Sequence, residues 1–271
     1  MPDDVRALLG VIHPRQISDT TFEGASFDPG WGRLFGGQVF AQALSAARRT
    51  CAEDRALHAT HADFLRKGDV SAPLRFDVEL TRDGRTFSAR RVVASQHGKT
   101  MLTLSASFQR PETGITHQDP MPDAPGPPDP ATLERPQAPA ARCFLSKMVD
   151  PVNYRAPIAR PAVRQIWWRT REPMPDNAAD HRIVLAYASD FHMLTTSLQP
   201  HAMSFLTPGI RIATLNHAMW FHADFRMDEW LLYDVRSGAA SGGRATVKGR
   251  VYRRDGTLVA TTFQEGMVRL S

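Results

Sequence analysis

Hydrophobic and polar residues alternate with a period of two along several stretches of this chain. The clearest alternation runs through residues 74–80, where charged residues separate Leu74, Phe76, Val78 and Leu80. This pattern is typical of a β-strand with one buried face. Two Asp-Gly pairs, at 83–84 and 255–256, are hairpin-turn signals next to such stretches. The pattern therefore predicts antiparallel strands.

A helical pattern precedes the strands in the first half. The stretch GGQVFAQALSAARRT puts four apolar residues on one helical stripe, Phe40, Ala43, Leu44 and Ala47. Arg48 and Arg49 follow near its end, where cations suit the helix dipole. In the second half a shorter helix is predicted at roughly 190–199, stopped by Pro200.

The two halves of the chain resemble each other. Five landmarks recur at offsets between 155 and 159, pairing His61 with His217, Leu74 with Trp230, Val78 with Val235, Arg85 with Arg244, and Gln109 with Gln264. A helix followed by antiparallel strands, twice over, predicts an α+β fold in which a helix covers a curved antiparallel sheet in each half.

A proline-rich stretch separates the halves. Nine of the twenty prolines lie between 111 and 140. Because proline lacks a backbone donor and fixes φ, we expect a linker outside the core. The predicted organisation is a first repeat at 1–110, a linker at 111–141 and a second repeat at 142–271.

Composition narrows the class of protein. Apolar residues form 42% of the 271-residue chain, without a continuous run that could span a membrane. The two cysteines are too few for a disulfide framework, and the start MPDDVRALLG lacks a secretory pattern, so a cytoplasmic protein is expected. The net charge is +5, with a pI near 9.6. The Lys and Arg residues are scattered, without a motif for binding nucleic acid, so nucleic acid is not expected as a partner. A small phosphorylated ligand, or a protein that is basic without an anionic partner, would each explain this charge.

Gln264 is an unusual residue for its position. It lies in the strand-like run LVATTFQEGMVRL and shares a face with Leu258, Ala260, Thr262, Val268 and Leu270. A buried amide must be hydrogen-bonded or cost about 1–3 kcal/mol. The residues around it form part of a larger set of motifs: GRLFGGQVFAQAL, FLRKGD, TRDGRTFSARRV, YASDFHML, LQPH, ATLNHAMWFH, EWLLYDV and TTFQEG. In this order the chain resembles the acyl-CoA thioesterase II family, which has two fused hot-dog domains in one chain.

The resemblance implies a reaction and a catalytic group. The family hydrolyses acyl-CoA to free acid and CoA, with a water activated by an Asp, a Thr or Ser, and a Gln. These roles fall on Asp190 of YASD, Thr214 of ATLNHAMWFH and Gln264 of FQEG. The chain has Asn216 where the family usually has Asp, a position that we do not expect to be catalytic. No cofactor is implied, and further association into a homo-oligomer is expected.

The start of the first helix is a candidate oxyanion site. Gly36, Gly37 and Gln38 lie where free backbone N–H groups and the helix dipole would face a developing negative charge. Tight helix–sheet contact would equally explain the glycines. The first repeat lacks the full catalytic set, because His58 stands opposite Thr214 and LFGG opposite Asp190, although Gln109 matches Gln264. One catalytic site per chain is therefore predicted.

Basic residues on the paired strands are candidates for the phosphates of CoA. They are Arg85, Arg90, Arg91 and Arg244, with Lys248 and Arg250 nearby. A metal site is not expected, because His58 and His61 would point to opposite faces of a strand.

Three other functions stay open. One is a hot-dog protein that binds acyl-CoA without turnover. The second is an enoyl-CoA hydratase, in which His192 could act as a base. The third is a protein that uses its proline-rich linker to bind a partner.

Overall fold

The described residues of the chain form one continuous antiparallel sheet of twelve strands. The computed structural model describes residues 3–133, 136 and 138–271. Residues 1, 2, 134, 135 and 137, which belong to the predicted first repeat and linker, lie outside the described residues. The strands are β1 (Arg15–Gln16), β2 (Thr21–Gly24), β3 (Ala56–Phe64), β4 (Leu74–Asp83), β5 (Phe87–Gln96), β6 (Lys99–Gln109), β7 (Phe144–Met148), β8 (Val163–Thr170), β9 (Ile210–Phe221), β10 (Leu231–Ser241), β11 (Arg244–Arg253) and β12 (Leu258–Leu270).

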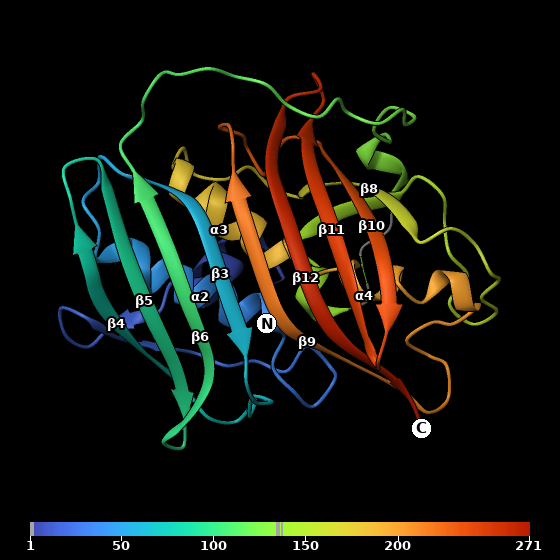
Figure 1. Cartoon of the computed structure of the whole chain (residues 1–271), viewed down its shortest axis with the longest axis horizontal. Coiled ribbons are helices and arrows are strands. Elements are labelled where there is room, and N and C mark those ends of the chain that lie inside the picture. Colours follow the sequence, from blue (N-terminus) through green and yellow to red (C-terminus); the bar gives the residue numbers. More distant parts are fainter. Residues whose placement is uncertain (1–2, 134–135, 137) are drawn as a thin grey trace.

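The order of the strands repeats in mirror image about the middle of the sheet. The order is β1-β2-β4-β5-β6-β3-β9-β12-β11-β10-β8-β7, so each strand of the first half has a counterpart in the second (Figure 1). The halves join where β3 pairs with β9, with Ala62 opposite His217 and Asp63 opposite Asn216. The predicted α+β fold with two curved antiparallel halves is therefore confirmed.

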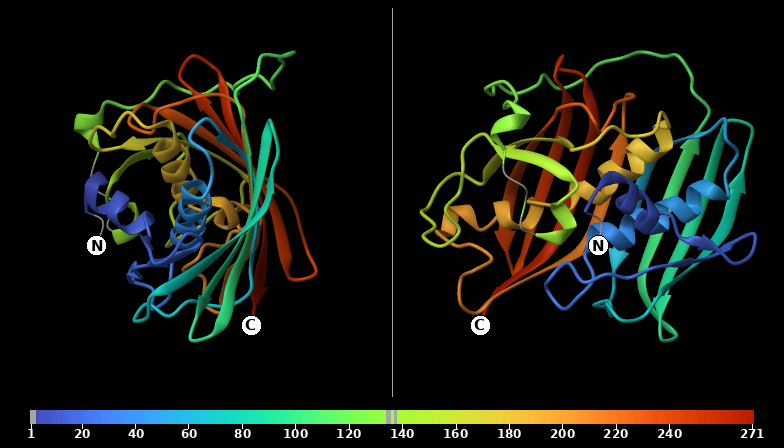
Figure 2. Two further views of the ribbon diagram at one scale, coloured as in Figure 1. Left: turned by 90° about the vertical axis from the view of Figure 1, so that its left-hand side faces the viewer. Right: turned by 180° about the vertical axis from the view of Figure 1, so that it is seen from behind.

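The helices lie on one face of the sheet, as the edge-on view in Figure 2 shows. They are α1 (Val5–Ile12), α2 (Gly36–Arg49), α3 (Ala178–Ser189) and α4 (Met193–Thr196), with short 3-10 turns η1 (Pro130–Thr132), η2 (Pro139–Ala141) and η3 (Gln199–His201). Both long helices are almost fully buried: residues 37–47 of α2 and 183–189 of α3 are enclosed. They form the core between the helix layer and the sheet.

The predicted second-half helix is wrong in position. The long helix covers 178–189, before Asp190, and only the short α4 lies within 190–199. Because α3 is buried on almost every side, its sequence has no apolar stripe with polar residues opposite, which is the pattern that reveals a helix. Asn177 caps its start by accepting a hydrogen bond from the backbone N–H of Ala179 at 3.0 Å.

This shift changes how the repeats correspond. Residues 50–55 connect α2 to β3, whereas the longer segment 190–209 connects α3 to β9. Asp190, the residue after α3, therefore corresponds to Thr50, the residue after α2. The predicted correspondence of Asp190 with LFGG is wrong, since it assumes one constant offset through helix and strands.

The proline-rich stretch packs on the outer face of the second half. Residues 111–133, here called the strap, cross over the sheet from the end of β6 (Figure 1). Trp167 donates its indole N–H to the carbonyl of Pro125 at 2.7 Å, and the Tyr252 hydroxyl donates to that of Pro120 at 3.2 Å. Met121 and Ala124 pack against a second apolar cluster of Trp167, Leu232, Tyr252 and Leu258. The strap therefore carries a small core of its own, which the proline content did not predict.

Within the described residues, no helix has the length and apolar character that crossing a membrane requires.

Candidate active site

Three polar side chains from separate elements meet beside the start of α2. Gln264 of β12 donates its amide Nε2 to Asp190 Oδ1 at 2.6 Å and to Thr214 Oγ1 at 3.1 Å. The Thr214 hydroxyl also donates to Asp190 Oδ1 at 3.4 Å. The structure thus brings Asp190, Thr214 and Gln264 into one hydrogen-bonded group.

The direction of these bonds follows from their chemistry. A carboxylate can only accept, so the Gln264 atom at 2.6 Å must be the amide nitrogen. Its two hydrogens are then both used, and its oxygen Oε1 is buried without a protein partner among the described residues. The group therefore presents acceptor atoms, the Asp190 carboxylate and the Gln264 Oε1, for a further donor.

Asp190 also caps α2 from outside that helix. Phe35, the residue before α2, has no side chain that can cap, and the Gly37 N–H donates instead to Asp190 Oδ2 at 3.0 Å. Asp190 itself ends α3, so the end of one helix supplies the anion that the start of the other favours. The helix whose start faces the Asp190 carboxylate is therefore α2, and not the helix that the sequence predicts at 190–199.

Burial raises the pKa of Asp190 above its ordinary value. Hydrogen bonds from Gln264, Gly37 and Thr214 and the charge of Arg33 oppose this rise without cancelling it. A raised pKa makes this carboxylate a stronger base than an exposed Asp.

An irregularity in β9, where it pairs with β12, turns Thr214 toward the site. The register passes from Glu265 opposite Asn216 to Gly266 opposite Thr214, so Leu215 is an extra residue in β9. Without this bulge, strict alternation would put Thr214 and His217 on opposite faces, since they are three residues apart. Asn216 Oδ1 accepts from the Glu265 N–H at 3.2 Å and so satisfies a backbone donor at the irregularity. An Asp at this position would offer the same acceptor.

A buried, hydrogen-bonded pair of a serine and a histidine lies next to the residues of this group. The sequence did not predict this pair. Ser189 Oγ lies 2.9 Å from His217 Nε2 and donates to the Ala186 carbonyl at 2.9 Å. Because a hydroxyl has one hydrogen, His217 must be the donor to Ser189, which fixes its proton on Nε2. Burial lowers the pKa of His217 to about 3, so it is neutral at neutral pH. Ser189 precedes Asp190, and His217 pairs with Gln264 across the strands, so the pair joins all three segments of the site.

The predicted oxyanion donors are partly occupied. The Gly37 amide donates to Asp190, and the Gln38 amide to the Phe35 carbonyl at 3.1 Å. The Gln38 side chain donates to the Ala25 carbonyl at 2.8 Å. Only the Gly36 amide makes no hydrogen bond within the described residues. The glycines are also sterically required, because a Cβ would lie 2.8 Å from Asp190 Oδ2 at Gly36, and 2.3 Å from the Tyr187 carbonyl oxygen at Gly37.

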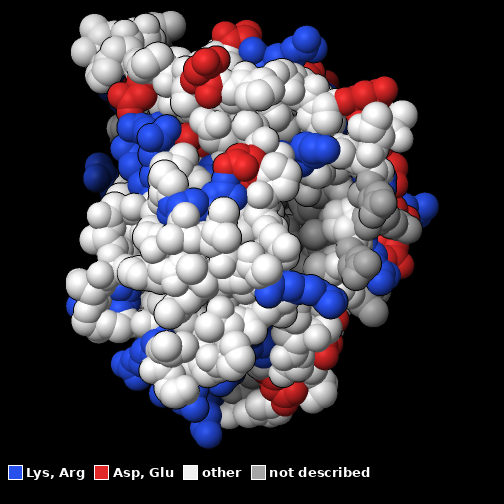
Figure 3. Space-filling model, turned by 90° about the vertical axis from the view of Figure 1, so that its right-hand side faces the viewer, with Lys and Arg blue, Asp and Glu red and all other residues white. Residues whose placement is uncertain are grey.

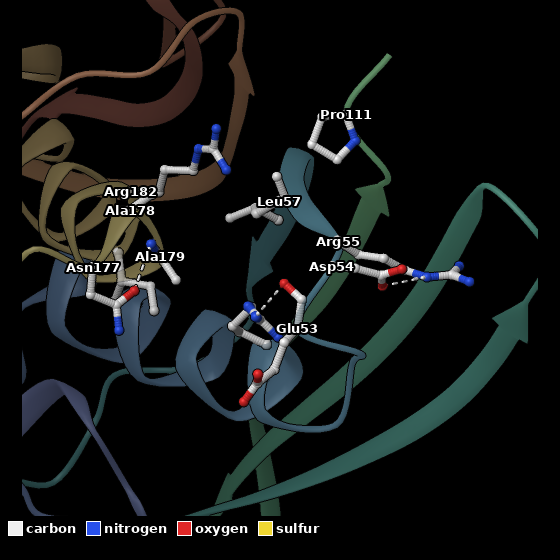
Figure 4. Close-up of a pocket in the computed structure, with 12 residues that line it drawn as sticks. Glu53, Asp54, Arg55, Leu57, Pro111, Asn177, Ala178, Ala179 and Arg182 are labelled. Atoms are coloured by element: carbon white, nitrogen blue, oxygen red, sulfur yellow. Dashed lines mark hydrogen bonds and ion pairs between the residues drawn. The ribbon is translucent and has the colours of Figure 1, made fainter.

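The corresponding place in the first repeat has different chemistry. His58 Nε2 lies 2.8 Å from Ser107 Oγ, and Gln109 donates to Glu112 at 3.1 Å. Thr50, which corresponds to Asp190 in the first repeat, donates its hydroxyl to the Ala47 carbonyl. A cavity of about 260 Å³ lies near this end of the helices, lined by the residues after α2, the start of α3 and Arg182 (Figure 4). Neither this cavity nor a second one beside β8 includes Asp190, Thr214 or Gln264 in its lining.

The predicted phosphate ligands do not gather around Asp190. Arg90 is buried and donates to Asp83 and to the carbonyls of Arg82, Ala89 and Thr50, so it is a structural residue and not a surface ligand. Arg85 is exposed in the β4–β5 turn. Arg91 pairs with Glu79 at 3.9 Å and Arg244 with Glu265 at 3.0 Å. On the face in Figure 3, Lys and Arg are interspersed with Asp and Glu.

In the described part of the chain, no group of three or more His, Cys, Asp or Glu side chains could hold a metal ion. His192, two residues after Asp190, has a left-handed backbone conformation with φ of 69°. Burial lowers the pKa of His192 to about 3.

The fold, with two mirrored halves that each wrap a sheet around a long helix, defines a double hot-dog protein. The chain matches the family Acyl-CoA thioesterase over residues 149–267 and the Acyl-CoA thioesterase N-terminal domain over 27–109. The chain belongs to the acyl-CoA thioesterase family. The resemblance seen in the sequence, and the expectation of a thioester hydrolase, are therefore confirmed.

Individual relatives cover the chain throughout. Acyl-CoA thioesterase 2 of Haemophilus influenzae is 40% identical and covers 100% of both chains. Human acyl-coenzyme A thioesterase 8 is 35% identical over 99% of this chain and 91% of its own length. Among solved structures, acyl-CoA thioesterase II TesB2 of Mycobacterium marinum is 38% identical with a TM-score of 0.83 over 98% of both chains. A hot-dog protein of Alicyclobacillus acidocaldarius, 20% identical with a TM-score of 0.79 over 98% of both chains, shares the fold.

Proposed function

We propose that this protein hydrolyses acyl-CoA to a free carboxylic acid and CoA, with Asp190 as the general base. The observation that carries the proposal is the hydrogen-bonded group of Asp190, Thr214 and Gln264, which fixes a carboxylate and a free amide oxygen side by side. One water can donate one hydrogen to Asp190 and the other to Gln264 Oε1. Both lone pairs of its oxygen are then free, and one of them can attack the thioester carbonyl carbon.

The reaction proceeds through a tetrahedral intermediate. The water oxygen bonds to the carbonyl carbon while Asp190 takes one of its protons, and the carbonyl oxygen becomes an oxyanion. The free Gly36 amide at the start of α2 is the donor placed to stabilise that charge. The carbon–sulfur bond then breaks, and the thiolate leaves readily because the pKa of a thiol is about 8.5. The proton on Asp190 passes to the thiolate, which completes CoA and restores the base.

Thr214 has a positioning role in this scheme. Its hydroxyl donates to Asp190 and accepts from Gln264, so it fixes the angle between the two groups that hold the water. Family membership and full-length likeness to named acyl-CoA thioesterases support the substrate class. Rates with a panel of acyl-CoAs of different chain lengths would determine which acyl chain the protein prefers.

The test is thiol release, followed with a chromogenic disulfide. We expect wild type to release CoA and Asp190→Asn to be slower by about 100- to 10,000-fold, the usual contribution of a general base. Asp19→Asn, at an exposed carboxylate, is the matched control and should keep wild-type activity. Equal rates for wild type and Asp190→Asn would remove Asp190 from the mechanism. Binding of acyl-CoA without thiol release would favour a binding protein. A change in conjugated-enoyl absorbance without thiol release would favour a hydratase.

The acid side of the pH profile gives an independent check. The base must be ionised, so kcat should fall as the pH is lowered through the raised pKa of Asp190. The midpoint should therefore lie above about 3.9, the value of an unperturbed Asp. A midpoint below that value would contradict a buried base.

A further inference from the structure

Two loops meet next to the candidate active site, and both carry exposed positive charge. One is residues 25–35, before α2, and the other is residues 65–73, after β3. Ser26 Oγ donates to the Ala72 carbonyl at 2.6 Å, and a Cβ at Gly68 would lie 2.4 Å from Leu34 Cδ1. The loops are therefore packed together at the lower end of β3 in Figure 1.

Both loops lead directly to Asp190. Phe35 ends the first loop and stacks on Phe191, the neighbour of Asp190, with ring centroids 4.5 Å apart. Phe64 precedes the second loop, and its Cε1 lies 3.3 Å from where a Cβ of Gly36 would be. Gly36 in turn faces the Asp190 carboxylate. A ligand whose reactive carbon lies at Asp190 would therefore extend past these loops on its way to solvent.

The loops carry three cations that form no ion pair with a carboxylate among the described residues, although the charge of Arg33 acts on Asp190 at longer range. Arg33, Arg66 and Lys67 are all exposed. Arg66 donates only to the Thr100 carbonyl, at 2.7 Å. The acids in the same loops are already used: Asp28 accepts from the backbone N–H groups of residues 30–32, and Asp69 from Ser71, with His97 Nε2 2.9 Å away. We call Arg33, Arg66 and Lys67 the basic rim.

An exposed aromatic ring accompanies the basic rim. Trp31 is 48% exposed, and its ring makes an edge contact with Phe35 at 6.0 Å between centroids. Gly30 and Gly32 on either side have φ of 97° and 64°, values that favour glycine and present the residue between them outward. A large exposed indole beside free cations matches a ligand with a flat base and phosphates.

Building on the proposed function, we propose that Trp31 and the basic rim bind the nucleotide end of CoA, with the indole stacking on adenine and the cations contacting the phosphates. Thirteen bonds separate the thioester sulfur from the first phosphorus, or roughly 15 Å at the extension of a peptide backbone. Arg33 is three residues from Gly36, at most about 11 Å along the chain, so its side chain lies within that reach. The strand arginines predicted from the sequence include Arg90, which is buried, and Arg91 and Arg244, which already have acidic partners.

The experiment compares two thioesters of the same acyl group, one on CoA and one on N-acetylcysteamine, which lacks the phosphates and the adenine. For Arg33→Ala we expect a KM for acyl-CoA about 3- to 10-fold higher, and at least about 30-fold higher when Arg66→Ala and Lys67→Ala are added. Trp31→Ala should raise this KM about 3- to 10-fold. For Trp31→Ala, and for Arg66→Ala combined with Lys67→Ala, kcat and the kcat/KM for the N-acetylcysteamine thioester should stay within about threefold of wild type. Because the charge of Arg33 also acts on Asp190, the role of Arg33 in binding is decided by the bisphosphate titration below. Arg254→Ala, at an exposed arginine of the β11–β12 turn, is the matched control and should change neither.

Direct titration separates the failure of this proposal from that of the proposed function. Calorimetry should show that adenosine 3′,5′-bisphosphate binds wild type, and that it binds the variant with Arg33→Ala, Arg66→Ala and Lys67→Ala at least about tenfold more weakly. Binding to wild type should weaken as the salt concentration rises. This measurement decides the role of the basic rim even if no thioester is hydrolysed. Equal losses on both thioesters, an unchanged KM for acyl-CoA, or equal bisphosphate binding by wild type and the triple variant would overturn it.

Discussion

Asp190 shows how one side chain serves folding and chemistry together. Its carboxylate ends α3, accepts the Gly37 N–H at the start of α2, and accepts from Gln264 and Thr214. These bonds hold both carboxylate oxygens in place, while burial raises the pKa of the group. The same buried surroundings therefore fix the position of the Asp190 carboxylate and increase its basicity.

The buried Ser189–His217 pair should act on catalysis only through position. His217→Leu removes the donor to Ser189, so we expect kcat to fall at least about tenfold with KM within twofold. His217→Gln keeps a donor and should recover part of the loss. Because the pKa of His217 is about 3, neither variant should add or remove a step in the pH profile between 5 and 9. A lost pH step in that range would make His217 a titrating catalytic group, and an unchanged kcat would remove its role.

At the scale of elements, the site depends on how closely two helices approach. α2 begins with two glycines, and its first turn lies against the end of α3. The sequence predicts α2 well, because its apolar residues recur at helical spacing. It does not predict α3, whose buried positions occupy every side of the helix.

Gly36→Ala tests that close approach. The new Cβ would lie 2.8 Å from Asp190 Oδ2, so the carboxylate must move, and we expect kcat to fall about 100-fold. The melting temperature should fall by a few degrees, because the displaced carboxylate also caps α2 through the Gly37 N–H. Gly10→Ala in α1 is the matched control, since its Cβ would meet nothing within 4 Å. Wild-type kcat in Gly36→Ala would show that Asp190 tolerates displacement.

At the scale of the whole molecule, the strap makes the outer face of the sheet different in its two halves. It covers the outer side of β8, β10 and β11 with Met121 and Ala124, where Trp167, Leu232 and Tyr252 would otherwise face water. Because side chains alternate along a strand, this cluster lies on the opposite face from the helices and the site. The strap should therefore contribute to stability and not to turnover.

Met121→Ser should lower the free energy of unfolding by about 1–2 kcal/mol, since it removes a half-buried apolar contact. Thermal unfolding should show a melting temperature a few degrees lower, with kcat unchanged. Ile115→Ser, at a fully exposed position of the strap, should leave both unchanged. A loss of activity in Met121→Ser without a loss of stability would place the strap in the catalytic cycle.

Much of the fold was readable from the sequence, because it depends on local patterns. Alternation gave the strands, Asp-Gly pairs the hairpins, and the recurring landmarks the two halves. For the site, the sequence supplied the identities of Asp190, Thr214 and Gln264 through family motifs, and their catalytic roles stay a proposal. It could not supply the Ser189–His217 pair, since an isolated Ser or His carries no signal of its partner.

The sequence by itself determined the strands and α2, because periodicity is a property of neighbours along the chain. Tertiary structure alone decided the rest. Pairing of β3 with β9 joined the halves, the extra residue Leu215 turned Thr214 inward, and the approach of α2 to α3 gave Asp190 a backbone donor. Each of these joins residues far apart in the chain. Their energies depend on packing and hydrogen bonds that no local pattern records.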